Sequence, residues 1–513
     1  MPTKTDKKPT PKKKKPATKA KKATSKKKVA PKLKLKPTDK VGRKRPRLAK
    51  KVKVYGPKRY LFTSAQNNTA IHEQFFSNLQ VLCEHYTAEI HVSRFIYRKR
   101  GLGALGNKDQ NYSDSQQELE WDSRVLPFLS DDDLQIAPDL VWCGRMNILP
   151  TAVNPLRGFE TYTRSNSGIY PHAKIALQSL PTMKGTKTRM NYTTGACTLR
   201  NYIVRKAGLK AEFHHCFGAL LVEVDEDGTW FARQINGNDK GTIHDLTLKV
   251  ENGNLTSDNR ILAVNYGDIH VWQVDENVIR GSITGKNSLQ KTLKPKYQFF
   301  HDVLDFKVKN HHDTSYVSKI KKNPHTSVLD EVKATFAFLD KTTQPWCQSV
   351  VVHSNHDAAF DRWLDSSDYK EDPLNAEFYL ESQLARTKAI LAKDSNFTMM
   401  RWLSEKYSKY KTIRYLKEDE SLVLKGIEFG LHGDKGPNGS RGSISSLSKM
   451  GCKINIGHSH SAIILGGCFQ SGCCTVADLG YNKGPNTHSH SHIITYTNGK
   501  RAIVTCQGDR WKL

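Results

Sequence analysis

Five apolar runs in the second half of the chain have the length of a β-strand, and each stops at side chains that can bind a metal. Val350–Val352 is the plainest of them, because three consecutive valines predict a strand covered on both faces, as in an α/β sheet. Ligands in such sheets collect outside the carboxyl ends of the strands. We therefore expect one site to form where these runs end. With their polar ends, the runs occupy residues 261–270, 297–302, 350–357, 426–434 and 454–460.

The polar residues at these five ends are Asp, Asn and His. A single buried histidine is usually a satisfied structural residue, but five strand ends of one kind are hard to explain by packing. Buried carboxylates, amides and imidazoles need partners, and a metal ion is a partner that they can share. The candidate ligands and acid/base residues are Asp268, His270, Asp302, Asn355, His356, Asp357, His432, His458 and His460.

These candidate ligands offer oxygen and imidazole nitrogen but no thiolate. Such a set suits Mn²⁺, Mg²⁺, Fe or Zn²⁺, and it excludes a structural zinc site built from cysteines. We expect Mn²⁺ as the first choice.

The order of the motifs along the chain is Asp-x-His, Asp, Asn-His-Asp, His and Gly-His-x-His. Over about residues 260–480, this order resembles that of the calcineurin-like metallophosphoesterase superfamily. The resemblance implies a two-metal phosphoesterase site on a four-layer αββα sandwich. Two metals about 3.5–4 Å apart can clamp the attacking and leaving oxygens of an in-line displacement.

The resemblance also implies a role for each residue. His356 would protonate the leaving oxygen, which suits an imidazole poised near neutrality, and Asp357 would orient it. The superfamily usually has Gly before the bridging Asp, and His301 stands in that place here, so Asp305 is an alternative to Asp302. The implied ligand sets are Asp268, His270 and His460 for the first metal, Asn355, His432 and His458 for the second, and Asp302 as the bridge.

The first half of the chain predicts a βαβ unit followed by antiparallel strands. A strand around Tyr60 precedes an amphipathic helix that Asn67–Thr69 could cap, with its apolar stripe at Ile71, Phe75, Leu79 and Leu82. Residues 88–97 predict the second strand, and there is no Gly-rich phosphate loop, so no nucleotide site is expected. Residues 213–235 alternate like a hairpin.

The positive charge of the chain is concentrated at its start. Residues 1–54 hold 24 of the 80 Lys and Arg but only 2 of the 50 acidic residues, a net charge of +22 that leaves +8 for the remaining 459 residues. With so few apolar residues, this segment cannot offset the entropy of ordering and should be a disordered tail. We expect residues 55–255 to form an α+β or α/β region and residues 256–513 to form the metallophosphoesterase domain.

A polybasic arm has three readings. It could bind the phosphates of DNA without reading sequence, serve as a nuclear address, or act as a solubilising tail or membrane-surface tether. DNA is favoured, because so many like charges repel one another unless a polyanion neutralises them. The candidate nucleic-acid-binding residues of the arm are Lys12, Lys13, Lys14, Lys15, Arg43, Lys44 and Arg45.

A Gly-rich loop at residues 434–442 directly follows His432 and carries Lys435 and Arg441. Beside a metal centre, these two cations could clamp a flanking phosphate. A glycine turn with two exposed bases is the alternative.

The chain shows no secretory signal and no run long enough to span a bilayer. Cys468, Cys473 and Cys474 cluster, but their spacing matches no zinc pattern, so they should be reduced packing residues. We expect a reducing compartment: the cytoplasm, which would be that of the host if a phage encodes the chain, with the nucleus as the alternative. DNA is the expected partner, no membrane is expected, and a homo-oligomer stays open.

The leading hypothesis is a two-metal phosphodiesterase that hydrolyses DNA. The early Ser64-Ala65-Gln66 strand and the later Gly-Asp-Ile-His motif also resemble the DNA-degrading early metallophosphoesterase proteins of lytic bacteriophages, which implies destruction of host DNA. One alternative is a phosphomonoesterase acting on phosphoproteins or nucleotides, since a dimetal site can hydrolyse both ester types. Another is a non-catalytic DNA-binding protein with a vestigial site.

Overall fold

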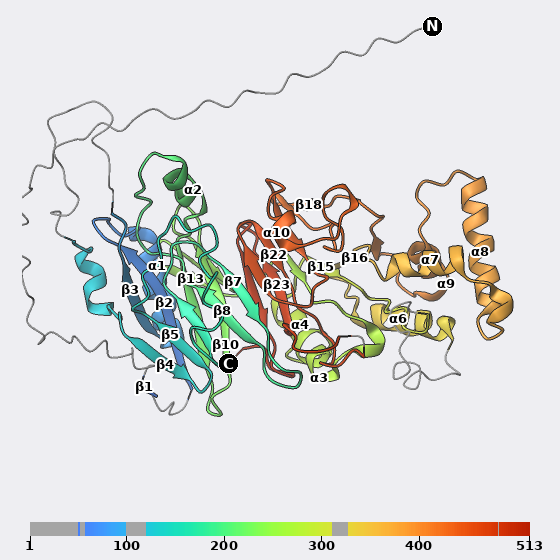
Figure 1. Cartoon of the computed structure of the whole chain (residues 1–513), viewed down its shortest axis with the longest axis horizontal. Helices are drawn as coiled ribbons and strands as arrows, with labels where there is room; N and C mark the ends of the chain where they lie inside the picture. The colour runs from blue at the N-terminus through green and yellow to red at the C-terminus, as the bar shows by residue number, and fades with distance from the viewer. Residues whose placement is uncertain (1–49, 52–56, 99–118, 310–326, 481, 513) are drawn as a thin grey trace, which may run out of the picture. The chain divides into compact units, whose positions relative to one another are not determined.

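The computed structural model describes residues 50–51, 57–98, 119–309, 327–480 and 482–512 (Figure 1). The expected tail, with its candidate nucleic-acid-binding residues, lies outside the described residues except for Lys50 and Lys51, which form a paired strand and so do not belong to a disordered segment. Leu48–Leu513 forms one compact unit.

The described strands form three sheets. The 11-stranded sheet has the order β1 (Lys50–Lys51), β4 (Asp133–Ala137), β5 (Leu140–Cys143), β6 (Ser167–Tyr170), β8 (Arg189–Thr193), β7 (Leu177–Leu180), β21 (Ile463–Leu465), β22 (Cys468–Gln470), β20 (Lys453–Ile456), β19 (Ile427–Glu428) and β18 (Val423–Leu424). The seven-stranded sheet has the order β13 (Asn254–Thr256), β12 (Leu248–Glu251), β11 (Ile243–Asp245), β10 (Trp230–Gly237), β9 (Gly218–Val224), β2 (Lys58–Gln66) and β3 (Glu89–Phe95). The six-stranded sheet has the order β17 (Arg414–Tyr415), β16 (Gln348–Val351), β15 (Tyr297–Phe300), β14 (Ala263–Asn265), β23 (Ser491–Thr495) and β24 (Arg501–Thr505).

The described α-helices are α1 (Glu73–Tyr86), α2 (Lys206–His214), α3 (Glu276–Ile279), α4 (Leu289–Leu293), α6 (Val328–Thr342), α7 (Asp357–Ser366), α8 (Ala376–Leu391), α9 (Met399–Tyr407) and α10 (Ile444–Leu447). Short 3₁₀ turns are η2 (Ser123–Phe128), η3 (Val271–Gln273), η5 (Tyr369–Glu371) and η6 (Pro437–Gly439), and η4 (Arg280–Thr284) is a π-turn. No helix in the described ranges combines the length and apolarity that a membrane span needs.

Parallel pairing of β14, β15, β16 and β17 places the ends of the predicted strands at one edge of the six-stranded sheet. On one face, Val264, Phe300 and Val351 pack against α3, α4, α6, α7 and α9. Figure 1 shows α7, α8 and α9 grouped beside α6. On the other face, Phe299 and Val350 pack against the β18–β19 hairpin of the 11-stranded sheet. Both faces of these strands are covered, which explains their continuous apolar runs.

The short helix α10 packs on β20 and β22 through Leu447, Ile454 and Cys468. In this part of the chain the layers therefore follow the order helices, sheet, sheet, helix. The chain is a mixed α/β protein, as its sequence predicts.

The predicted βαβ unit at the start is confirmed as β2, α1 and β3, with β2 and β3 parallel. The predicted cap of the helix is wrong: α1 is capped by His72, whose Nδ1 accepts a hydrogen bond from the backbone N–H of Phe75. Asn67 accepts instead from the backbone N–H of Tyr97. The predicted hairpin is present as β9 and β10, although its first expected residue, Phe213, lies in α2.

Strands from both halves of the chain share the 11-stranded sheet, where Gln178 of β7 pairs with Ile463 of β21. A core cluster also joins all three sheets, with Phe62 from the seven-stranded sheet, Trp142 from the 11-stranded sheet and Ile503 from the six-stranded sheet. The domain boundary expected between residues 255 and 256 would divide this shared sheet. Separate folding of the two regions stays a prediction.

Candidate metal centre

Two sheets bring the five predicted strand ends together. The turns after β14, β15 and β16 carry Asp268, Asp302 and Asn355 at one edge of the six-stranded sheet. The turns after β19 and β20, which are parallel neighbours in the 11-stranded sheet, carry His432 and His458. The carboxyl ends of parallel strands thus face one another across the two packed sheets, which is where ligands are expected.

The first set of candidate ligands is Asp268, His270 and His460, all buried. The Nε2 atoms of His270 and His460 lie 3.1 Å apart, and His460 Nε2 lies 3.4 Å from Asp268 Oδ2. With Asp302, these residues bring four ligand atoms within 4.8 Å of one another. This spacing suits a single cation.

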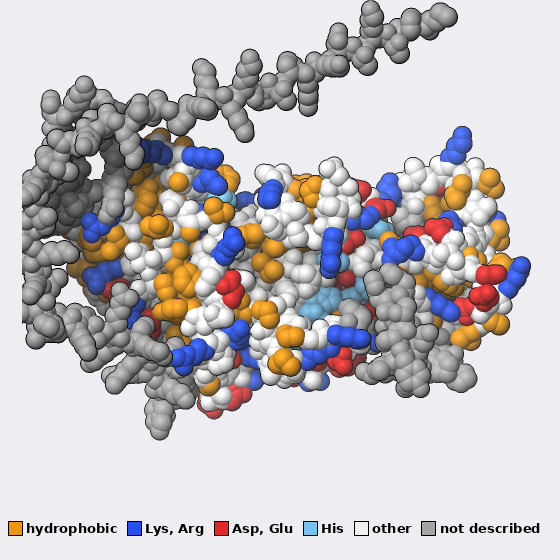
Figure 2. Space-filling model, in the orientation of Figure 1, with side chains coloured by type: hydrophobic (Ala, Val, Ile, Leu, Met, Phe, Trp, Pro, Cys, Tyr) orange, Lys and Arg blue, Asp and Glu red, His pale blue; other side chains and the backbone are white. Residues whose placement is uncertain are grey.

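The second set is Asn355, His432 and His458. Asn355 Oδ1 lies 3.1 Å from His432 Nε2 and 3.2 Å from His458 Nδ1. His432 is buried, whereas Asn355 and His458 are partly exposed. Solvent therefore reaches this set, and Figure 2 shows histidine side chains exposed on the surface.

Asp302 stands between the two sets. Its Oδ2 atom lies 3.5 Å from His270 Nε2 and 3.2 Å from His432 Nε2. Asp302 Oδ1 and both carboxylate oxygens of Asp268 are buried without a hydrogen-bond partner among the described residues. Buried carboxylate oxygens are costly unless a cation or donor meets them, so these residues fit bound divalent cations.

Asp305, the alternative bridging residue, supports His270 from behind. Its Oδ1 lies 3.0 Å from His270 Nδ1, and its Oδ2 accepts a hydrogen bond of 2.7 Å from Gln273 Nε2. A carboxylate on the far nitrogen of a ligand histidine fixes the orientation of the ring and the nitrogen that faces the metal. The geometry favours Asp302 over Asp305 as the residue shared by both sets.

His301, which stands in place of the usual glycine, is buried against His432, with 3.4 Å between their Nδ1 atoms. Burial lowers the pKa of His301 to about 3, so this imidazole is neutral at physiological pH. It packs beside the site without adding charge to it.

The partner expected for His356 is different in the structure. His356 Nδ1 lies 2.5 Å from the main-chain carbonyl oxygen of Asp305. Asp357, which we expected to orient His356, begins α7 and accepts a hydrogen bond of 3.1 Å from the backbone N–H of Ser354. Its carboxylate reaches back to the preceding turn, because the first turn of the helix carries it away from the imidazole. The orienting group is therefore Asp305.

Four of the candidate ligands have left-handed backbone conformations. The φ values are 49° for His270, 47° for Asp302, 76° for His458 and 57° for His460. Such conformations are uncommon outside glycine, and they cluster at functional sites when the surrounding structure holds them in place. They turn the chain sharply after each strand, so that residues two apart can face one site.

Gly457 allows the two sheets to approach at this point. A Cβ atom added there would lie 2.2 Å from Asp268 Oδ1, far inside van der Waals contact. The glycine of the Gly-His-x-His motif therefore makes room for the carboxylate of the Asp-x-His motif.

The carboxylates dominate the electrostatics of the site. Burial and the neighbouring Asp302 raise the pKa of Asp268 to about 7. Burial opposes a positive charge on His270 and His432. Asp305 nevertheless raises the pKa of His270 to about 9, and Asp302 raises the pKa of His432 to about 9. Burial also opposes the charge of Asp302, but the nearby histidines hold its pKa well below the usual range. The cluster thus favours bound positive charge.

The two cations of the Gly-rich loop lie near the rim of the site. Lys435 forms an ion pair with Glu418, and its backbone pairs with that of Arg441. Arg441 is exposed, and its charge adds to the effect of burial in lowering the pKa of His458 to about 4. Arg441 therefore fits a phosphate-binding role better than Lys435, whose charge is already balanced.

Gln273, which follows His270 by three residues, donates to Asp305, and no sequence motif indicates this role. A second such residue is Cys473, which was predicted to be a packing residue. Cys473 is buried, but with His460 and His488 it brings ligand atoms within 4.8 Å of one another. No spacing rule links these residues, which come from three separate turns. All ten cysteines are free thiols.

A phage protein is related to this chain in sequence. No protein-family model matches the chain, and no solved structure matches it either. The chain is 38% identical over 462 residues to "Protein A1" of Escherichia phage T5, a match that covers 87% of this chain and 81% of the relative. This supports the expected relationship to bacteriophage proteins. The chain therefore belongs to the family of Protein A1 of phage T5.

Proposed function

We propose that the chain is a two-metal-dependent phosphodiesterase that hydrolyses DNA. The observation that carries the proposal is the position of Asp302, whose Oδ2 lies within 3.5 Å of both His270 and His432. One carboxylate between two sets of His, Asp and Asn ligands is the arrangement that a pair of divalent ions requires. The layering of helices, two sheets and a helix also agrees with the sandwich of the calcineurin-like metallophosphoesterases.

When bound, the two metals would activate a water nucleophile and stabilise the charge that develops on the phosphate. Mn²⁺ is the first choice for this ligand set. The residues that would hold the ions are Asp268, His270 and His460 on one side, Asn355, His432 and His458 on the other, and Asp302 between them.

His356 is the proposed general acid. It lies beside the ligand sets, with its ring centroid 4.7 Å from that of His270, and it is partly exposed. Its Nδ1 faces the Asp305 carbonyl oxygen, to which it can donate a hydrogen bond. This contact leaves Nε2 to carry the proton that the leaving oxygen receives.

The proposed substrate rests on charge and on family. The 24 bases among residues 1–54 suit a polyanion, and the identified relative is a phage protein. We place the activity in the cytoplasm of an infected host cell, acting on host DNA. The arm would raise the local concentration of DNA through counterion release, without reading its sequence.

The test is incubation of the full chain with linear and with circular duplex DNA in the presence of Mn²⁺. We expect hydrolysis that EDTA abolishes and that Asp302→Asn lacks. Cleavage of the circle would indicate an endonuclease, and cleavage of the linear form alone would indicate an exonuclease.

A parallel assay compares bis(p-nitrophenyl) phosphate with p-nitrophenyl phosphate. Hydrolysis of the monoester alone, with both DNA forms intact, would replace the nuclease proposal with a phosphomonoesterase.

A further inference from the structure

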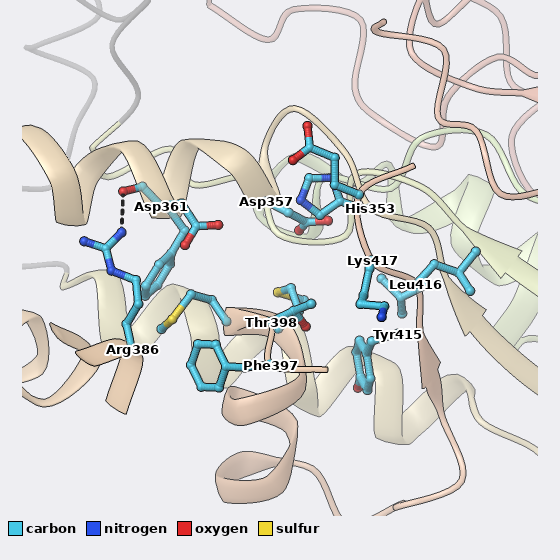
Figure 3. A pocket seen from close by; sticks show the side chains of 14 residues that line it. His353, Asp357, Asp361, Arg386, Phe397, Thr398, Tyr415, Leu416 and Lys417 are labelled. Atoms are coloured by element: carbon cyan, nitrogen blue, oxygen red, sulfur yellow. Dashed lines mark hydrogen bonds between the residues drawn. The ribbon is translucent and has the colours of Figure 1, made fainter. Parts of the chain in front are cut away.

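A pocket of about 280 Å³ opens between α7, α9 and the segment after β17 (Figure 3). It is lined by Asp357, the residue directly after the proposed acid His356, and by His353, which follows β16. The pocket therefore lies next to the metal centre but contains none of the candidate ligands. Its volume is just below the range of about 300–1,000 Å³ that is typical of small-molecule sites, so it suits a small group.

One wall of the pocket offers hydrogen-bond acceptors. Asp357 and Asp361 lie four residues apart on α7 and so share one face of the helix. Asp357 is only 5% exposed, and while its Oδ2 accepts from Ser354, its Oδ1 has no hydrogen-bond partner among the described residues. A buried acceptor without a donor calls for an N–H or O–H group from a ligand.

The other walls are apolar and aromatic. They include Phe397, Met399, Met400 and Tyr415. Figure 3 shows the rings of Phe397 and Tyr415 on the opposite side of the pocket from the carboxylates of Asp357 and Asp361. Aromatic faces and thioether groups favour a flat, polarisable ligand.

The cations at the rim are already engaged. Arg386 pairs with Asp365 at 2.8 Å and donates to the Asp361 carbonyl oxygen. Lys417 Nζ donates to the Ser395 carbonyl oxygen. Because carboxylates line the pocket, Arg386 is paired with Asp365 and Lys417 already donates to a carbonyl oxygen, a phosphate is a poor fit for its interior, whereas an N–H-rich ring is a good one.

We propose that this pocket binds a guanine base, that of a nucleotide adjacent to the phosphodiester undergoing cleavage. The adjacent N1–H and N2–H₂ groups of guanine can both donate to carboxylate oxygens. Adenine and cytosine place a ring acceptor beside their amino group, and thymine flanks its single N–H with two carbonyls. The base would be read while unpaired, by its Watson–Crick edge and by stacking. The inference that the base belongs to a nucleic acid substrate rests on the proposed function, whereas guanine binding itself does not.

The first experiment measures nucleoside binding to the full chain in EDTA by titration calorimetry, with guanosine, inosine, adenosine and cytidine as probes. We expect guanosine to bind at least about tenfold more tightly than inosine, which lacks only the N2 amino group. Equal binding of all four nucleosides, or binding of none, would overturn the proposal.

Two variants test the pocket walls. Asp361→Asn and Phe397→Ala should each weaken guanosine binding about tenfold or more, through a lost acceptor and a lost stacking surface. Glu381→Gln is the matched control, because Glu381 lies on the neighbouring helix α8, pairs with Lys406 and, like Lys406, does not line the pocket. Unchanged binding in both wall variants would contradict the assignment.

Hydrolysis of bis(p-nitrophenyl) phosphate, which carries no base, separates this proposal from the proposed function. Asp361→Asn and Phe397→Ala should retain that hydrolysis in Mn²⁺ while losing guanosine. If the parent chain binds guanosine but hydrolyses no diester, the nuclease proposal fails and the pocket stands. If it hydrolyses diesters without distinguishing guanosine from inosine, the pocket proposal fails alone. If Asp361→Asn loses both guanosine binding and diester hydrolysis, the Phe397→Ala variant decides. Weakened guanosine binding with retained hydrolysis in Phe397→Ala supports the pocket, and unchanged guanosine binding contradicts it.

Discussion

Asp302 Oδ2 lies 3.2 Å from His432 Nε2, so a carboxylate that follows a strand of the six-stranded sheet meets an imidazole that follows a strand of the 11-stranded sheet. The same oxygen lies 3.5 Å from His270 Nε2. This contact ties the two ligand sets together, and the proposed two-metal chemistry depends on it.

Asp302→Asn should abolish DNA hydrolysis and remove at least one equivalent of bound metal. The amide keeps the size of the side chain but loses the charge shared by both sets. Metal content of the purified variant, measured by elemental analysis, checks this directly.

Asp305→Asn is the matched control, and the structure changes what we expect of it. Because Asp305 supports His270, its loss should lower metal affinity by about 10–100-fold without removing a ligand, so excess Mn²⁺ should restore activity. If Asp305→Asn lost activity that excess Mn²⁺ did not restore, and Asp302→Asn retained its bound metal, then Asp305 would be the bridging ligand and Asp302 the supporting residue.

His356→Asn should retain both metals and slow the chemical step by about 10²–10⁴, the range for a lost general acid. A good leaving group needs no proton, so the loss should shrink for p-nitrophenyl esters. Asp357→Asn should keep the parent's dependence on the leaving group, because Asp305 rather than Asp357 contacts His356. An equal loss on every leaving group would remove His356 from the acid role.

The five strand ends could be predicted from the sequence because they depend on local patterns. An apolar run followed by Asp, Asn or His identifies both a covered strand and its carboxyl end, and β14, β15, β16, β19 and β20 all lie where such runs occur. That the ends converge follows from parallel pairing, which Val350–Val352 already indicated.

The supporting contacts could not be predicted, because they join residues that no local pattern connects. The Asp305 carbonyl meets His356 across 51 residues of chain, and Gln178 pairs with Ile463 to join the two halves in one sheet. The resemblance assigned Asp357 to His356, whereas the start of α7 directs the Asp357 carboxylate to Ser354.

Arg233 should be a major determinant of stability. It is buried in the seven-stranded sheet, forms an ion pair with Glu223 and contacts Asp245 with its Nε at 2.7 Å. Arg233→Met would leave the buried carboxylate of Asp245 without its cation and Glu223 with Arg59 alone, and it should lower the free energy of unfolding by about 3–5 kcal/mol.

Arg94→Met is the control for this change, because Arg94 pairs with Asp131 at the surface and should cost only about 0–1 kcal/mol. Urea denaturation of both variants gives the comparison. Equal losses would mean that the buried cluster contributes no more than a surface pair.

His215 should make stability depend on pH. It is buried between Tyr202 Oη at 2.7 Å and the Thr198 carbonyl oxygen at 3.0 Å, and burial lowers its pKa from 6.5 to about 3. The unfolded chain therefore takes up the proton first, and the free energy of unfolding falls as the pH drops below about 6.5.

The His215 contribution to this slope is about 1.4 kcal/mol per pH unit. His215→Gln, which stays neutral, should reduce by about that amount the slope measured by urea denaturation between pH 6 and pH 5. An unchanged slope would show that His215 is protonated in the folded chain.

Removal of the arm should separate DNA association from chemistry. Deletion of residues 1–47 takes away 21 Lys and Arg and keeps β1, whose Lys50 pairs with Leu134. Each phosphate contact contributes about −0.9 to the slope of log affinity against log salt, so the deletion should flatten that slope by several units. Turnover at saturating DNA and low salt should stay the same, because the ligand sets and His356 lie far along the chain from the deleted residues.

A full-length chain with the arm lysines and arginines changed to glutamine controls for length and should behave like the deletion. Salt titration of binding and of initial rate on these three proteins gives the answer, and an unchanged slope would mean that the arm does not engage DNA.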